Sequence, residues 1–163
     1  MATTTASTGA ALVPARLRAA TLSDLPAIER LLTASNLPLD GVAEALPSFV
    51  VAESGGELIG VAGLEPCRDN ALLRSVAVVD AWRSRGIGRA LVERVIAEAE
   101  SRGVHALYLL TTTAERWFPS LGFRTIAREV VPADVRATTE FQSACPASAA
   151  VMCRDCAPGG QSR

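Results

Sequence analysis

Two glycines, Gly86 and Gly88, stand between a strand-like run and an amphipathic helix, and this junction constrains the fold more than any other feature. Residues 71–79 form the strand-like run, and after the glycines apolar residues recur at helical spacing as far as Ala99. Arg102-Gly103 predicts the end of the helix, and the apolar residues 104–111 predict a buried strand. Strand, loop, helix and buried strand in this order predict a sheet with helices packed on its faces.

The remaining segments extend this pattern to a mixed α/β fold with six or seven strands and about four helices. Ser54-Gly55-Gly56-Glu57 joins two apolar runs and predicts a hairpin. Ser23 or Asp24 is the predicted cap of the first helix, whose first turn tolerates Pro26. Further strands are predicted at residues 15–20, 49–53, 58–65, from 123 onward and 147–154, and short helices at 40–46 and 114–120.

Composition excludes several classes of function. The 163 residues fit one domain, which we predict at residues 15–156 between a flexible leader (1–14) and a flexible tail (157–163). Lys and Arg total 16 and Asp and Glu total 17, so the net charge of −1 provides no broad basic surface for nucleic acid or an anionic membrane. No apolar run is long enough to cross a bilayer, and four unevenly spaced cysteines do not form a disulfide framework. We expect a cytoplasmic protein with reduced thiols.

The glycine junction has the chemistry of an anion-binding site. Glycines at a strand-to-helix turn let backbone N–H groups approach a ligand, and the helix N-terminus adds partial positive charge and unpaired donors. Arg83, Arg85 and Arg89 add cationic charge to a chain that is otherwise nearly neutral. A P-loop would need Gly-Lys-Ser/Thr, and a dinucleotide fingerprint would need a third glycine where Leu91 stands. The alternative is an ordinary helix start with surface arginines.

The pattern Arg83-x-x-Gly86-x-Gly88 resembles the pyrophosphate-binding signature of the GNAT acetyltransferases, at the family's usual spacing from Val76-Ala77-Val78. The resemblance runs from about residue 16 to residue 128 and includes Leu121-Gly122-Phe123. It implies acetyl-CoA as co-substrate and a strand that bulges and splays from its neighbour. It also implies a pantetheine arm held by Val76, Ala77 and Val78, and a pyrophosphate held by Arg83, Ser84, Arg85, Gly86, Ile87, Gly88 and Arg89. A glycine is common in the family at the position of Ser84.

Two narrower resemblances concern the acceptor. Leu109-Leu-Thr-Thr-Thr113, Trp117-Phe118 and Val131-Pro132 resemble the acetyltransferase domain of N-acetylglutamate synthases. The core as a whole, ending at residues 145–152, resembles a group named arsenic-resistance N-acetyltransferases. Both imply a small-molecule amine acceptor that is an acidic, amino-acid-like compound.

Arg74 is the candidate for binding the acid group, because a planar guanidinium suits bidentate capture of a carboxylate, phosphinate or arsinate. The alternative is a structural arginine paired with Glu65 or another carboxylate across the sheet. The other candidate substrate-binding residues are Ser75, Thr111, Cys145 and Ser148.

Direct acetyl transfer needs a group that accepts a proton from the acceptor's ammonium, and no metal. Glu65 is the candidate, directly or through water, and the alternative is an exposed glutamate at a strand end. A backbone N–H near Val76 would stabilise the oxyanion. Many relatives carry a tyrosine as general acid where this chain has Phe118, which leaves water, Thr111 to Thr113, Cys145 or no acid at all.

Three alternatives stay open. In the first, the acceptor is glutamate or a peptide N-terminus, as in other GNAT branches. In the second, the chain is an acyl-CoA-binding sensor without catalysis, which the absence of the tyrosine allows. A homodimer that exchanges its last strand between subunits is compatible with each of them.

Overall fold

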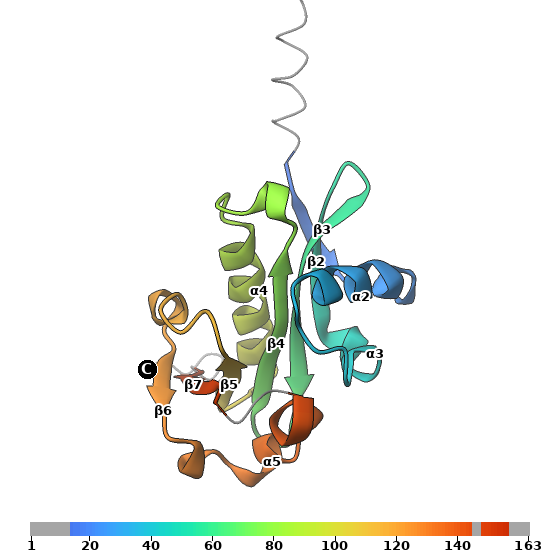
Figure 1. The fold of residues 1–163 in the computed structure, drawn as a ribbon. Coiled ribbons are helices and arrows are strands. Elements are labelled where there is room, and N and C mark those ends of the chain that lie inside the picture. Colours follow the sequence, from blue (N-terminus) through green and yellow to red (C-terminus); the bar gives the residue numbers. More distant parts are fainter. Residues whose placement is uncertain (1–13, 145–147, 157–163) are drawn as a thin grey trace, which may run out of the picture.

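The computed structural model describes residues 14–144 and 148–156, which form one mixed sheet with helices on both faces (Figure 1). The predicted leader and tail, apart from residue 14, and Cys145 lie outside the described residues. The strands are β1 (Arg16–Ala19), β2 (Phe49–Ser54), β3 (Glu57–Pro66), β4 (Ala71–Val78), β5 (Ala106–Thr111), β6 (Arg124–Ile126) and β7 (Ala150–Asp155). The α-helices are α2 (Leu25–Ala34), α3 (Val42–Ala45), α4 (Ile87–Ser101) and α5 (Ala133–Arg136). Seven strands and four α-helices in the described part of the chain confirm the predicted fold class.

The sheet has the order β1-β2-β3-β4-β5-β7-β6, in which β4 and β5 are the parallel pair and every other pair is antiparallel. A parallel pair needs a crossover, and α4 supplies it. The last strand of the chain, β7, lies inside the sheet, between β5 and the edge strand β6. β7 pairs along its full length with β5, whereas only three of its residues pair with β6.

The helices cover opposite faces because successive strand residues point to opposite sides of the sheet. Val50 and Ala52 of β2 pack in the cluster that contains the buried residues of α4. Phe49 and Val51, their neighbours in the same strand, pack with α2 and α3 instead. In the described part of the chain, no helix has the length and apolar character that a membrane crossing requires.

The β2–β3 hairpin and the end of α4 form at the predicted glycines. Gly55 and Gly56 have φ of 60° and 83°, as a two-residue turn with both φ positive requires. Gly103 has φ of 75° and follows the last residues of α4. Both turns therefore form where the glycines predicted them.

Three short segments differ from the prediction. The helix expected at 114–120 is a 3-10 turn at Phe118–Leu121, with a proline in its first turn. The helix expected at 40–46 is reduced to α3 and a following 3-10 turn at Leu46–Ser48. Residues 127–144 had no predicted structure, yet they contain α5 and a π-helical turn at Glu140–Ala144. This segment has no apolar periodicity, so only its tertiary contacts define it.

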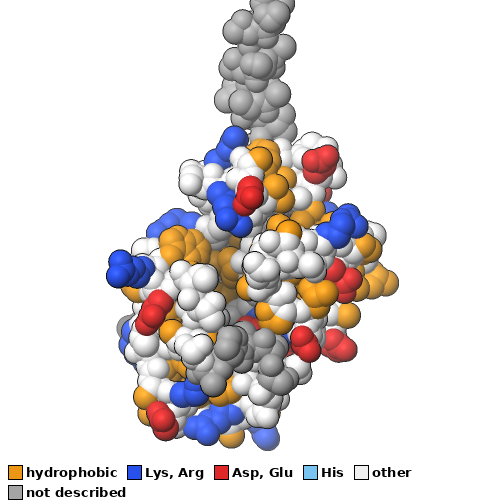
Figure 2. All heavy atoms as spheres, viewed as in Figure 1, with side chains coloured by type: hydrophobic (Ala, Val, Ile, Leu, Met, Phe, Trp, Pro, Cys, Tyr) orange, Lys and Arg blue, Asp and Glu red, His pale blue; other side chains and the backbone are white. Residues whose placement is uncertain are grey.

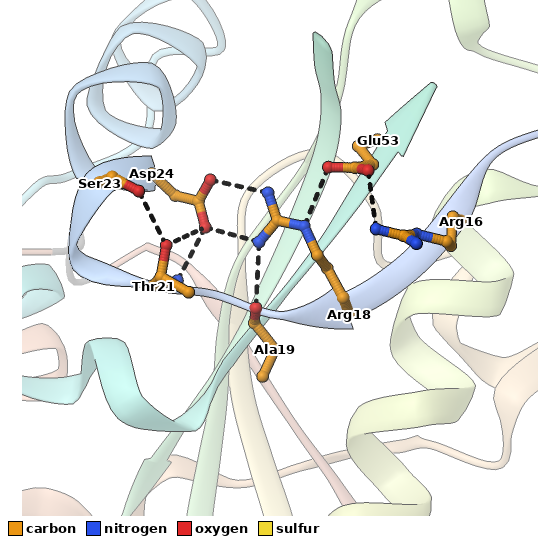
Figure 3. Close-up of polar contacts among 7 residues, drawn as sticks. All are labelled: Arg16, Arg18, Ala19, Thr21, Ser23, Asp24 and Glu53. Atoms are coloured by element: carbon orange, nitrogen blue, oxygen red, sulfur yellow. Dashed lines mark hydrogen bonds and ion pairs between the residues drawn. The ribbon is translucent and has the colours of Figure 1, made fainter. Parts of the chain in front are cut away.

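A polar network, rather than the predicted helix cap, fixes the entry into α2 (Figure 3). Arg18 on β1 donates to both carboxylate oxygens of Asp24, at 2.8 and 2.9 Å, and to Glu53 on β2 at 2.9 Å. Asp24 in turn accepts from the Thr21 backbone N–H at 2.7 Å. Neither Ser23 nor Asp24 makes a side-chain cap of α2, because Asp24 is engaged by Arg18 and Thr21.

Asp24→Asn is expected to lower the free energy of unfolding by roughly 1–2 kcal/mol at pH 7 and much less at pH 2. The hydrogen bonds from Arg18 lower the pKa of Asp24 from 3.8 to about 2, although its burial acts in the opposite direction. A carboxylate with a depressed pKa stabilises the fold above its ordinary pKa, and this contribution is lost as the pH falls through the folded-state value. Urea unfolding of both proteins between pH 7 and pH 2 measures the difference. An equal loss of unfolding free energy at pH 7 and at pH 2 would contradict this prediction.

Candidate functional site

The sheet opens between β4 and β5. Only two residue pairs join these strands, Ala71 with Leu107 and Leu72 with Tyr108, and beyond them the strands diverge. A cavity of about 690 Å³ lies at the divergence and is lined from both strands, from the start of α4 and from the 3-10 turn at Phe118. Figure 2 shows this face of the molecule hollowed near its centre, with apolar side chains inside the hollow. The splay implied by the GNAT resemblance is therefore present.

A bulge in β4 faces this opening. Val61 pairs with Ala77 and Gly63 with Arg74, so the single residue Ala62 opposes both Ser75 and Val76. Ser75 has φ of 59°, which places it in the left-handed region at the point where the ladder is interrupted. A bulge of this kind releases backbone groups of β4 from pairing with β3. They become available at the edge of the cavity.

The glycine junction forms a concave turn at the start of α4. Ser84 and Gly86 have φ of 67° and 83°, and Gly86 is the residue at which the helix begins. The first helical hydrogen bond runs from the Ala90 N–H to the Gly86 carbonyl, so the N–H groups of residues 87–89 precede it. These donors, together with the dipole of a 15-residue helix, favour an anion.

Nine of the ten predicted cofactor-binding residues line the cavity: Val76, Ala77, Val78, Arg83, Ser84, Gly86, Ile87, Gly88 and Arg89. Arg85 does not line it. Its guanidinium lies over the Trp82 ring, 4.8 Å from the ring centroid. Arg83 donates to the Val78 carbonyl at 3.2 Å, and Arg89 donates to the Ser120 hydroxyl at 2.8 Å.

Both tryptophans of the chain, Trp82 and Trp117, line the same cavity, and the sequence did not predict this. Trp117 is 37% exposed and stands edge-on to the buried Phe118, with ring centroids 4.9 Å apart. Residues 35, 37 and 38, which follow α2, also line the cavity. They come from a part of the chain with no motif, so no sequence signal identified them.

Only some of the predicted substrate-binding residues line the cavity. Arg74, Ser75 and Thr111 line the cavity, whereas Ser148 is exposed and is not a lining residue. Glu65 does not line the cavity either. Its Oε1 accepts a hydrogen bond from Arg74 Nη1 at 2.9 Å, which is the structural pairing considered as the alternative for Arg74.

No tyrosine stands in the cavity to act as a general acid. Tyr108 is the only tyrosine of the chain, and although it lies on β5 it is not one of the residues that line the cavity. Burial, with a smaller contribution from Cys153, raises the pKa of Tyr108 to about 12. Burial also raises the pKa of Cys67 to about 12 and the pKa values of Cys153 and Cys156, which disfavours the thiolate form of these three cysteines at neutral pH.

Comparisons with known proteins agree with this geometry. A family model described as "Acetyltransferase (GNAT) domain" matches residues 46–125. A Chlorobaculum tepidum protein named as an uncharacterized N-acetyltransferase is 32% identical over 95 residues, which cover 58% of this chain and 61% of that protein. The amino-acid acetyltransferase of Pseudomonas putida is 34% identical over 90 residues, 54% of this chain and 21% of that protein. The chain thus spans less than two thirds of the length of these relatives.

Two solved structures share the fold. N-acetylglutamate synthase from Neisseria gonorrhoeae, solved with coenzyme A and N-acetyl-glutamate, superposes with a TM-score of 0.76 at 23% identity, over 88% of this chain and 35% of that one. A Mycobacterium tuberculosis protein solved in complex with coenzyme A superposes with a TM-score of 0.75 at 26% identity, over 87% of this chain and 99% of that one. The splayed sheet, the bulge and the glycine turn agree with the family match: residues 46–125 of the chain are similar to a GNAT acetyltransferase domain.

Proposed function

We propose that this protein transfers the acetyl group of acetyl-CoA to the amine of a small, amino-acid-like acceptor. The observation that carries the proposal is a single cavity that joins an anion-binding helix start to a bulged, splayed strand. The pyrophosphate would bind at the N–H groups of residues 87–89, near Arg83 and Arg89. The pantetheine arm would lie along Val76 to Val78, where the gap between β4 and β5 leaves room for it.

In the proposed reaction, the free amine attacks the thioester carbonyl carbon, the carbon–sulfur bond breaks and coenzyme A leaves as a thiolate. A backbone N–H of the β4 bulge near Val76 would stabilise the oxyanion. The proton of the acceptor's ammonium goes to a carboxylate or to water. Phe118 cannot protonate the thiolate, so we assign that step to water, or to no acid, because a thiolate leaves readily.

The acceptor class is a finer proposal. Named relatives are amino-acid acetyltransferases, and one solved relative holds N-acetyl-glutamate, which supports an amino-acid-like acceptor. An acidic acceptor, including an arsenic-bearing amino acid, is supported by the resemblances described above and by an arginine in the cavity, Arg74. Arg74 already contacts two carboxylates of the chain, so an acid group would have to share its guanidinium with them.

Thiol release from acetyl-CoA tests the function against glutamate, phosphinothricin, an arsenic-bearing analogue, a peptide N-terminus and a polyamine. We expect turnover with at least one amino-acid-like acceptor. Turnover restricted to the peptide or the polyamine would contradict the acceptor class but keep the acetyltransferase. Binding of acetyl-CoA without turnover on any amine would favour the sensor alternative.

Light scattering tests the proposed homodimer; within one chain β7 already pairs with β5 and β6.

A further inference from the structure

A polar cluster surrounds Arg74, one of the residues that line the cavity. This side chain is fully buried, and its guanidinium has four partners in the chain. Nη1 donates to Glu65 at 2.9 Å, Nη2 to the Asp40 carbonyl at 2.6 Å, and Nε to the Ser75 hydroxyl at 3.1 Å. Glu140 Oε1 lies 3.3 Å from the same Nε and completes the cluster.

Of the two carboxylates that contact Arg74, only Glu140 lines the cavity. It is also the one acidic residue among the cavity-lining residues of the described chain. Glu140 is 4% exposed, and buried carboxylates are kept charged by pairing with a cation, which here is Arg74. The cavity therefore presents a charged carboxylate beside Ser75, the residue at the β4 bulge.

The segment that carries Glu140 is fixed to the sheet. Asp134 of α5 accepts hydrogen bonds from the backbone N–H groups of Asp69 and Asn70, at 3.0 and 3.2 Å, in the turn before β4. Thr138 Oγ1 donates to the Val135 carbonyl at 2.8 Å and accepts from the Phe141 N–H at 3.2 Å. Asp134 thus anchors the segment to the turn before β4, and the bond from Phe141 to Thr138 links the two sides of Glu140, so its carboxylate is held in place before an acceptor arrives.

We propose that Glu140 binds the acceptor's ammonium group and determines that the substrate is an amine, while Arg74 is a positioning residue that holds the Glu140 carboxylate. This rests on the proposed function and assigns its amine-recognition step to Glu140, not to Glu65. Amines are protonated at neutral pH, and a fixed, buried carboxylate at the bulge provides the matching charge. An acceptor is then selected for its amine first, and its acid group is bound elsewhere in the cavity.

Glu140→Gln keeps the size of the side chain and removes its charge. Calorimetric titration of the coenzyme A complex with glutamate, glutarate and putrescine distinguishes the contribution of the amine to binding from that of the acid group. In the native protein, glutamate or putrescine should bind at least about 10-fold more tightly than glutarate, which has no amine, and Glu140→Gln should abolish this difference. Coenzyme A itself should bind both proteins within about twofold.

Glu65→Gln is the matched comparison, because it removes a carboxylate from the same guanidinium outside the cavity, and its effect on amine binding should be smaller. Should Glu140→Gln fail to fold, Glu140→Asp keeps the charge on a shorter side chain and should weaken amine binding in a folded protein. Stronger binding of glutamate to Glu140→Gln would overturn the inference, since Glu140 would then compete with the substrate's acid group. So would a larger loss in Glu65→Gln, or no amine binding by a protein that binds coenzyme A. A protein that does not bind coenzyme A would instead overturn the proposed function.

Discussion

Gly88→Asp is expected to raise the dissociation constant for acetyl-CoA by at least about 100-fold, while the melting temperature stays unchanged or rises slightly. An added Cβ at Gly88 would lie 3.7 Å from Val78 and 3.8 Å from Trp117, which are ordinary contacts, so the unliganded fold accepts it. An acidic residue in the first turn of a helix is favourable for the helix. The same carboxylate would occupy the cavity and repel the pyrophosphate, because both carry negative charge.

Gly88→Asn is the control, since asparagine has the size of aspartate without its charge. The excess loss in Gly88→Asp over Gly88→Asn measures the electrostatic part of pyrophosphate binding. Quenching of tryptophan fluorescence is a suitable readout, because both tryptophans line the cavity. If Gly88→Asp bound acetyl-CoA as tightly as the native protein, the pyrophosphate would not lie at the start of α4.

Gly63→Ala is expected to lower the free energy of unfolding by about 3 kcal/mol or more, the largest stability change we predict. Gly63 pairs with Phe49 across β2 and β3, and an added Cβ would overlap three carbons of the Phe49 ring. Phe49 is 1% exposed and packed against α2 and α3, so the ring has no space to move into. The melting temperature should fall by roughly 6–12 °C in a domain of this size.

A double-mutant cycle tests the cause. Phe49→Leu removes the ring and costs stability by leaving space, but Gly63→Ala should cost much less in that background than in the native one. Gly88→Ala serves as the comparison in the same melting experiment, because its Cβ meets only ordinary contacts and should not destabilise the fold. Additive costs of the two core substitutions would contradict the steric explanation.

The fold and the part of the cavity at the start of α4 were predictable because their signals are local. The glycine turn and α4 follow each other directly in the chain, so spacing alone relates them. The direction in which each side chain of the turn points cannot be predicted from sequence spacing. Arg83 and Arg85 have the same chemistry two residues apart, yet one lines the cavity and the other lies on Trp82.

The cluster around Arg74 was harder to predict because it is assembled from distant segments. The partners of Arg74 come from β3, from the connection before α3, and from the π-helical turn at Glu140–Ala144. The last of these has no periodic pattern, so the sequence pointed to Glu65, which is close in the chain, and missed Glu140. A buried ion pair between such segments is visible only once the sheet is assembled.

The short pairing between β4 and β5 has a consequence for how the protein holds together. With two residue pairs across that seam, the sheet is close to being two separate sheets, β1 to β4 and β5 to β7, joined by α4 and by side-chain packing. A ligand bound between β4 and β5 contacts both halves of the sheet and binds only the folded state. Its binding free energy is therefore added to the stability of the contact between the two halves. Bound co-substrate would then hold the two halves of the sheet together. Without it, the protein would be least stable between β4 and β5, where the proposed reaction takes place.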